Sequence, residues 1–242
     1  MNTVSPVNYD VIAPKYDARY AQNPLAGVSR ELRELVTKSR ARDVLEVGCG
    51  TGHWVIELHP LVQRIVGLDF SFGMLEQARI QSDALLLTNG DANYLPFPSG
   101  SFDLVLSLNA LQHYADQRAF ITEARRLLRP SGALAIVNLD PHIGRDQWYL
   151  YDYFEGVKAT DLRRFPSSGT LLDWMLGCPS RVARGGSYPP GIRRAGSAGQ
   201  SLHAKGWLLS TCIDKRRRLC RGAGPHPRRH RQRRRCTTHL HY

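Results

Sequence analysis

Long hydrophobic runs are missing from this sequence. No stretch of about 18 apolar residues occurs, so no membrane-spanning helix is expected. The opening MNTVSPVNYD has no basic patch followed by an apolar stretch, so we expect no secretory signal peptide and a cytoplasmic location. Cysteine is scarce in residues 1–177, where Cys49 stands alone, and a lone cysteine excludes a disulfide framework in that part.

Acidic residues nearly vanish after residue 177. Residues 178–242 hold 16 of the 33 Lys and Arg but a single acid, Asp214, whereas residues 1–177 hold 17 bases and 20 acids. The net charge of +12 therefore comes from the tail alone, and the body lacks the basic excess that would attract nucleic acid. The tail also shows no sustained apolar period. We therefore divide the chain into a domain at 1–177 and an irregular, disordered tail at 178–242.

Apolar runs and helical periods alternate along the domain. The runs that predict strands are Asp43–Val47, Arg64–Leu68, Ala84–Leu87, Leu104–Leu108 and Ala133–Asn138. The segments that predict helices are Trp54–Leu58, Ser71–Ile80 and Asp116–Leu128. Such alternation implies a mostly parallel, doubly wound α/β sheet with helices on both faces. Ligands of such sheets bind outside the carboxyl ends of the strands, so candidate functional residues should follow the strands.

A glycine loop, Glu46-Val47-Gly48-Cys49-Gly50-Thr51-Gly52, follows the first predicted strand directly. Glycine lets the backbone turn sharply and pass close to a ligand, because no Cβ intervenes. The spacing is G-x-G-x-G, whereas dinucleotide-binding loops use G-x-G-x-x-G. By itself the loop fits either a nucleotide cofactor or a tight strand-to-helix turn.

Acidic residues follow the next two predicted strands. Asp69 lies 17 residues beyond Gly52 and ends the second strand, where a carboxylate can accept both ribose hydroxyls of a nucleoside. The alternative is a helix N-cap, but Ser71 is available for that role. Asp91, in Gly90-Asp91-Ala92 after the third strand, can accept from an exocyclic amine such as adenine N6, and equally suits a turn.

Four segments in this order and spacing resemble the main motifs of class I S-adenosylmethionine-dependent methyltransferases, which share a Rossmann-like fold: VLEVGCGTG, GLDFS, GDANYLPFPSGSFDLVLS and EARRLLRPSGAL. The type 11 group, with ubiquinone- and menaquinone-biosynthesis enzymes, is the most similar, and YDVIAPKYDARY resembles its amino-terminal helix. The resemblance covers about residues 9–140. It implies an enzyme that binds S-adenosyl-L-methionine and methylates a small organic acceptor at carbon or oxygen.

The resemblance also implies a role for each matching residue. Those expected around the methionine moiety are Glu46, Gly48, Gly50 and Gly52. Those expected around the nucleoside are Asp69, Phe70, Asp91 and Ala92. Near the sulfonium and the acceptor we expect Asn109, and on a helix closing over the cofactor Tyr9 and Tyr16.

The chemistry leaves several alternatives open. A nicotinamide dehydrogenase would need the third glycine one residue later, and DANYLPFPSGSFD has no counterpart in it. Methyl transfer requires mainly orientation, with a general base for some acceptors. His113 and Asn109 are our catalytic candidates. His113, four residues past Asn109, and His53 are the possible bases, although each histidine also suits a structural role. No metal constellation occurs in the body, and the aromatic-rich segment 142–174 suits acceptor recognition or a packed lid helix.

The tail has three interpretations. Its basic clusters at 215–218 and 228–235 would bind RNA or DNA phosphates, with the body as a recruited methyltransferase. Its cysteines and histidines would bind zinc, but they lack paired C-x2-C spacing. Alternatively the tail is out-of-frame translation beginning near Leu176–Cys178, since the family continues with a helix and two antiparallel strands that we do not recognise here. The third interpretation predicts a sheet that lacks its last strands, and an inactive cofactor-binding remnant is a further alternative.

Overall fold

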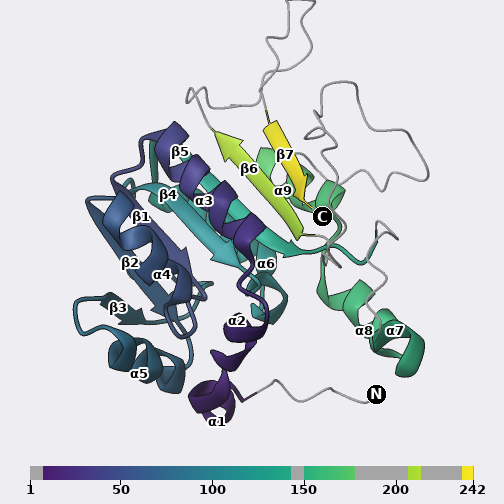
Figure 1. Ribbon diagram of the computed structural model, residues 1–242. Coiled ribbons are helices and arrows are strands. Elements are labelled where there is room, and N and C mark those ends of the chain that lie inside the picture. Colours follow the sequence, from purple (N-terminus) through teal and green to yellow (C-terminus); the bar gives the residue numbers. More distant parts are fainter. Residues whose placement is uncertain (1–7, 143–149, 178–206, 214–235, 242) are drawn as a thin grey trace, which may run out of the picture.

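Seven strands form one sheet in the computed structural model, which describes residues 8–142, 150–177, 207–213 and 236–241 (Figure 1). The strands are β1 (Asp43–Val47), β2 (Arg64–Asp69), β3 (Leu86–Asn89), β4 (Phe102–Leu108), β5 (Leu128–Leu139), β6 (Trp207–Ile213) and β7 (Cys236–His241). Their order is β3-β2-β1-β4-β5-β6-β7, and the first five in sequence run parallel. The winding reverses between β1 and β4, which puts the topological switch point at their carboxyl ends.

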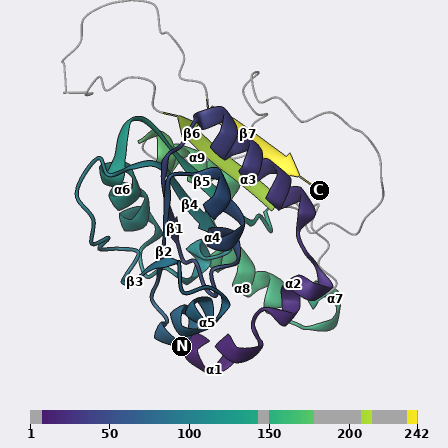
Figure 2. The same cartoon turned by 60° about the vertical axis from the view of Figure 1, so that its left-hand side comes forward.

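Helices cover both faces of the sheet (Figure 2). One face packs against α3 (Ala26–Ser39), α4 (His53–Leu58) and α5 (Phe72–Gln81), and the other against α6 (Gln117–Leu127) and α9 (Ser168–Leu176). Neighbouring strand residues face opposite cores, because side chains alternate along a strand. Both faces are therefore buried, which explains why the strands read as continuous apolar runs.

The remaining helices in the described part of the chain are short. They are α1 (Tyr9–Ile12), η1 (Ala13–Lys15), α2 (Ala18–Gln22), η2 (His59–Leu61), η3 (Leu111–His113), α7 (Leu150–Tyr153) and α8 (Val157–Arg164). In both views α1 lies beside α5 (Figures 1 and 2). Among the described residues, no helix is long and apolar enough to cross a membrane.

Two side-chain caps fix the helices that border the site. The Ser71 hydroxyl accepts the backbone N–H of Met74 at 3.1 Å, which confirms the predicted cap of α5. Asp116 caps α6 by accepting the N–H groups of Arg118 and Ala119 at 2.9 and 3.0 Å. Such caps satisfy backbone donors that the first helical turn leaves without partners.

The mostly parallel, Rossmann-like sheet is confirmed, with differences at three strand ends. β3 begins two residues later than predicted, and β4 begins at Phe102. β5 already starts at Leu128, because that residue pairs with Phe102 ahead of an irregularity in the register. Ser131 in this segment takes a φ of 73°, so the strand passes through a kink before its buried part begins at Gly132-Ala133.

The expectation that the sheet lacks its last strands is not met. β6 pairs antiparallel with β5, from Ala133↔Ile213 to Leu139↔Trp207, and β7 pairs antiparallel with β6. Without β6, the outer edge of β5 would have unpaired N–H and C=O groups, and a strand of almost any sequence can satisfy them. The apolar run in WLLSTCI is short and stands between basic segments, so its sequence pattern alone does not predict a strand.

Candidate functional site

The glycine loop turns back over the tip of β2. Gly48, Gly50 and Gly52 all have positive φ, at 74°, 54° and 80°, a conformation that other residues adopt at a cost. The backbone N–H groups of Gly48 and Cys49 donate to the Leu68 carbonyl at 2.7 and 3.0 Å. Gly52 ends the loop against Ala78 of α5, so its missing side chain also serves packing.

Asp69, at the end of β2, joins this loop to the next helix. Its carboxylate accepts the Gly50 N–H at 2.7 Å and the Ser71 N–H at 2.9 Å. The Asn89 amide holds the same turn by donating to the carbonyls of Asp69 and Phe70 at 3.0 and 2.9 Å. Burial raises the pKa of the Asp69 carboxyl, although the backbone N–H groups of Gly50 and Ser71 act against the shift. Each oxygen keeps a further lone pair, so the carboxylate can still accept hydroxyls of a ligand.

Glu46, the fourth residue of β1, is buried with 1% of its surface exposed, and its Oε2 has no hydrogen-bond partner. Burial raises the pKa of this carboxyl well above its ordinary value, and the charge of Asp69 raises it further. An unpartnered buried carboxyl is costly to maintain. A ligand with a cationic or N–H donor group would remove this cost, which fits a methionine moiety.

The residues expected around adenine lie beyond the tips of β2 and β3. Phe70 is 78% exposed and offers a free aromatic face for stacking. Asp91 accepts the Asn93 N–H at 2.8 Å, and Ala92 is buried behind it. The buried Asn93 Oδ1 has no partner. A planar ligand with polar edges suits this arrangement.

The amino-terminal helices are fastened over the glycine loop by two aspartates that the sequence analysis missed. Asp10 accepts from the Ser71 hydroxyl at 2.5 Å and from the Gly73 N–H at 2.8 Å. Asp17 accepts from Thr51 and from the Gln81 amide. The sequence signal was present, because each aspartate follows one of the two tyrosines, Tyr9 and Tyr16, that were expected there.

Tyr16 and Tyr9 form a bridge from the loop toward η3. A Cβ placed on Gly50 would lie 3.8 Å from Tyr16 Cε1, and the two tyrosine rings meet edge to face at 6.2 Å. The Tyr9 hydroxyl oxygen lies 2.8 Å from His113 Nε2, and the Arg164 guanidinium lies 3.1 Å from Nδ1. Burial and Arg164 together lower the pKa of His113 to about 4, so the imidazole is neutral at pH 7. Burial raises the pKa of Tyr9 to about 12.

Asn109 follows β4 in a left-handed conformation with φ 52°. Its backbone N–H donates to the Val137 carbonyl at 2.8 Å, and its own carbonyl accepts the Gln112 amide at 2.7 Å. These bonds tie the turn before His113 to β5. Asn109 thus lies at the carboxyl end of β4, on one side of the switch point.

His53 and Cys49 have surroundings that suit packing. The His53 ring stacks on Tyr20 of α2 with centroids 3.8 Å apart and planes 4° from parallel, and burial lowers its pKa. Cys49 is buried, and burial raises the pKa of its thiol well above the ordinary value. A thiol with a raised pKa forms little thiolate, so Cys49 is a poor nucleophile.

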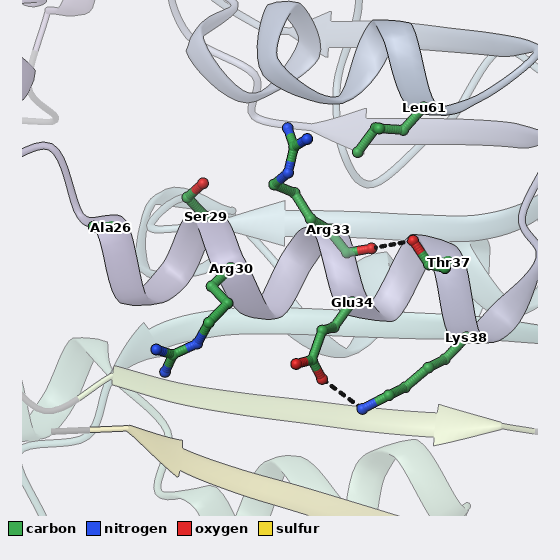
Figure 3. Close-up of a pocket in the computed structure, with 8 residues that line it drawn as sticks. All are labelled: Ala26, Ser29, Arg30, Arg33, Glu34, Thr37, Lys38 and Leu61. Atoms are coloured by element: carbon green, nitrogen blue, oxygen red, sulfur yellow. Dashed lines mark hydrogen bonds and ion pairs between the residues drawn. The ribbon is translucent and has the colours of Figure 1, made fainter.

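A hollow of about 610 Å³ lies elsewhere, on the outer face of α3 (Figure 3). It is lined by Ala26, Ser29, Arg30, Arg33, Glu34, Thr37 and Lys38 of the helix and by Leu61. Lys38 points to Glu34 and pairs with it at 2.5 Å, and both side chains are largely exposed. This hollow does not border the strand tips, and exposed paired charges do not make a cofactor site.

The tail candidates fall largely outside the described residues. The basic clusters at 215–218 and 228–235 lie there entirely, as do Trp148 and Tyr149 of the aromatic segment. For β6 and β7 only the backbone is described, so the proposed zinc ligands Cys212 and Cys236 have no described side chains.

Replacing Gly48 by Ala should destabilise the protein strongly. A Cβ at Gly48 would come within 2.3 Å of the Ala110 Cβ and 3.0 Å of the Tyr114 hydroxyl, at a φ of 74°. We expect a loss of about 2–4 kcal/mol in the free energy of unfolding, from overpacking and backbone strain together. Gly100→Ala is the control, since φ is 69° there but nothing lies within 4 Å, and about 1 kcal/mol should be lost. Equal losses in urea unfolding would contradict the close approach.

The chain matches known methyltransferases in sequence. The family described as a methyltransferase domain matches residues 45–136. Malonyl-[acyl-carrier protein] O-methyltransferase of Hahella chejuensis is 40% identical, covering 65% of this chain and 58% of its own length. Demethylmenaquinone methyltransferase of Lactiplantibacillus plantarum is 35% identical, covering 52% of this chain and 58% of its own. Across these two and three further curated relatives, the part matched by this chain is between 40% and 58% of the relative's own length.

A solved methyltransferase structure has the same fold as this chain. A methyltransferase from Thermotoga maritima, dependent on S-adenosylmethionine, superposes with a TM-score of 0.54 at 25% identity, over 70% of this chain and 78% of that one. The segment that matches the methyltransferase domain family, residues 45–136, runs from β1 into β5 and includes the glycine loop and Asp69. Residues 45–136 are therefore similar to a methyltransferase domain, and the sheet that carries them has the Rossmann-like fold of S-adenosylmethionine-dependent methyltransferases.

Proposed function

We propose that this protein transfers a methyl group from S-adenosyl-L-methionine to a small organic acceptor, at carbon or oxygen. The observation that carries the proposal is a pair of carboxyls, the buried Glu46 and the partly buried Asp69, set around a glycine loop at the switch point of the sheet. Glu46 has an unused buried acceptor for the methionine amine, and Asp69 has lone pairs for the ribose hydroxyls.

The remaining predicted residues have separate roles in this proposal. Phe70, Asp91 and the Ala92 N–H hold the adenine, and Gly48 and Gly50 let the backbone approach the ligand. Tyr16 and Tyr9 cover the glycine loop and exclude water from the cofactor. Asn109 and His113 border the acceptor. The cofactor, when bound, supplies an activated methyl group, so the protein mainly orients the acceptor for an in-line displacement.

The acceptor is proposed at the level of a small molecule. One relative is named as a malonyl-[acyl-carrier protein] O-methyltransferase and another as a demethylmenaquinone methyltransferase, so the named acceptors of similar proteins differ in chemistry. The neutral His113 is a weak base. Acceptors that are already acidic or nucleophilic therefore suit the site better than aliphatic alcohols.

A labelled-methyl assay with the full chain tests the proposal. S-adenosylmethionine carrying a ¹⁴C methyl group is incubated with panels of phenols, quinone precursors, carboxylic acids and amines, and extracted products are counted. We expect transfer to at least one acidic acceptor, with inhibition by S-adenosylhomocysteine. Cofactor binding without transfer to any panel member would favour the non-catalytic remnant instead.

A further inference from the structure

Arg164, the last residue of α8, is a half-buried cation without a carboxylate partner among the described residues. Its described side-chain hydrogen bond runs to His113 Nδ1 at 3.1 Å. Half-burial removes part of the water that would stabilise the guanidinium, so an unpaired arginine here is ready to bind an anion.

The end of α8 is fixed on two sides. The Gln117 amide donates to the Arg164 carbonyl at 2.9 Å, and His142 Nε2 lies 2.8 Å from the Phe165 carbonyl. Within the helix, buried Asp161 accepts the Tyr151 hydroxyl at 3.1 Å. The start of α6 and the segment after β5 therefore hold the end of α8, with Arg164, in place.

The contacts of His113 determine its proton position. A guanidinium only donates, so Nδ1 accepts from Arg164 and the ring proton resides on Nε2. The Tyr9 hydroxyl oxygen lies beside the ring, 2.8 Å from Nε2 and 3.5 Å from Nδ1. The Tyr9 O–H is then available to a third group, and four N–H groups of Arg164 remain beyond the one that His113 accepts.

We propose that Arg164 and Tyr9 together bind a carboxylate group of the methyl acceptor, with His113 as the positioning residue between them. This inference deepens the proposed function. The assignment of the carboxylate to the methyl acceptor rests on that function, whereas the carboxylate site itself is argued from the contacts of Arg164 and Tyr9. Tyr9 also contacts Tyr16, which faces Gly50 of the loop, so a carboxylate held here lies on the far side of the tyrosines from the glycine loop. A planar carboxylate matches the guanidinium fork and adds a short bond from the tyrosine hydroxyl.

The test follows the His113 imidazole by NMR in the full chain, without cofactor. The probe is sodium acetate, with acetamide as the neutral probe of similar shape and sodium chloride holding the ionic strength constant. Acetate should raise the pKa of His113 from about 4 toward its ordinary 6.5, because it offsets the charge of Arg164. Acetamide should leave the titration unchanged.

Variants complete the test. Arg164→Gln should raise the pKa of His113 by itself and weaken the acetate response by about tenfold, the scale of a lost charge-assisted hydrogen bond. Arg164→Lys should keep part of the response. The matched control is Arg163→Gln, because Arg163 is exposed and its described side-chain bond stays within its helix, to Thr160 at 3.2 Å, so this variant should respond like the parent.

Equal effects of acetate and acetamide, or an Arg164→Gln variant that answers acetate like the parent, would overturn the carboxylate site. Far-UV circular dichroism confirms that each variant is folded. Since no cofactor is present, this result is independent of S-adenosylmethionine binding. A protein that binds acetate as expected but not the cofactor would overturn the proposed function alone.

Discussion

Replacing Asp69 by Ala should weaken S-adenosylmethionine binding by about 30- to 1000-fold, or about 2–4 kcal/mol. The carboxylate is expected to accept two ribose hydroxyls, and charge-assisted hydrogen bonds in a buried site are the strong ones. The same side chain holds the Gly50 and Ser71 N–H groups at 2.7 and 2.9 Å, so the loop loses its anchor as well. Isothermal titration calorimetry measures the effect directly.

Two further variants separate charge from shape. Asp69→Asn keeps one acceptor oxygen for the loop but loses the charge, so it should fall between the parent and Asp69→Ala. Asp83→Ala removes an exposed carboxylate from the chain after α5 and should leave the affinity unchanged. Undiminished affinity in Asp69→Ala would mean that the ribose binds elsewhere.

Replacing Glu46 by Gln should have opposite effects on stability and on binding. In the apo protein the buried Oε2 has no partner, so an ionised Glu46 destabilises the fold. The amide should therefore raise the free energy of unfolding at neutral pH, by on the order of 1–3 kcal/mol. It should also weaken S-adenosylmethionine binding by about tenfold or more, because the methionine amine loses an anionic partner.

The pH dependence of stability tests the same group. The folded-state pKa of Glu46 is raised well above 4.5, so its protonated form stabilises the fold at low pH. That stability is lost as the pH rises from the ordinary pKa through the raised one, where the unfolded chain has already released the proton. Glu46→Gln should flatten this fall, whereas Glu76→Gln, an exposed change on α5, should not. A destabilised Glu46→Gln variant with normal affinity would refute the assigned role.

The sequence predicted the sheet because each parallel strand is a short apolar run buried on both faces. It also predicted the loop and Asp69, since sharp turns need glycine and strand tips present their last side chain to the ligand edge. The start of the helix beside them followed from local capping chemistry at Ser71. These features depend on residues that are close together in the sequence, so they can be predicted from a single sequence.

Other parts of the site depend on contacts between distant segments. Arg164 lies 51 residues from His113, and Asp17 lies 34 residues from Thr51, and no local pattern announces either meeting. The two Tyr-Asp pairs at 9–10 and 16–17 were visible, but only the folded chain gives their aspartates a partner. The unpartnered state of Glu46 is likewise a property of three-dimensional packing.

The strands of the tail, β6 and β7, also depend on contacts between segments that are distant in the sequence. The pairing of β6 and β7 depends on the open edge of β5 and on backbone groups, which leave little trace in composition. The hypothesis of a reading-frame change near Leu176–Cys178 stays a prediction. Reading the nucleotide sequence in the other two frames tests it, because a true frame change predicts that one of them continues with two alternating apolar strands.

The central claim is that the strand tips of this domain hold S-adenosylmethionine between Glu46, the glycine loop and Asp69. A calorimetric titration of the full chain with S-adenosylhomocysteine, beside one with NAD, tests it most directly. We predict one-to-one binding of the sulfur nucleoside and no heat from NAD. Binding of NAD instead, or of neither compound by a folded protein, would contradict the account.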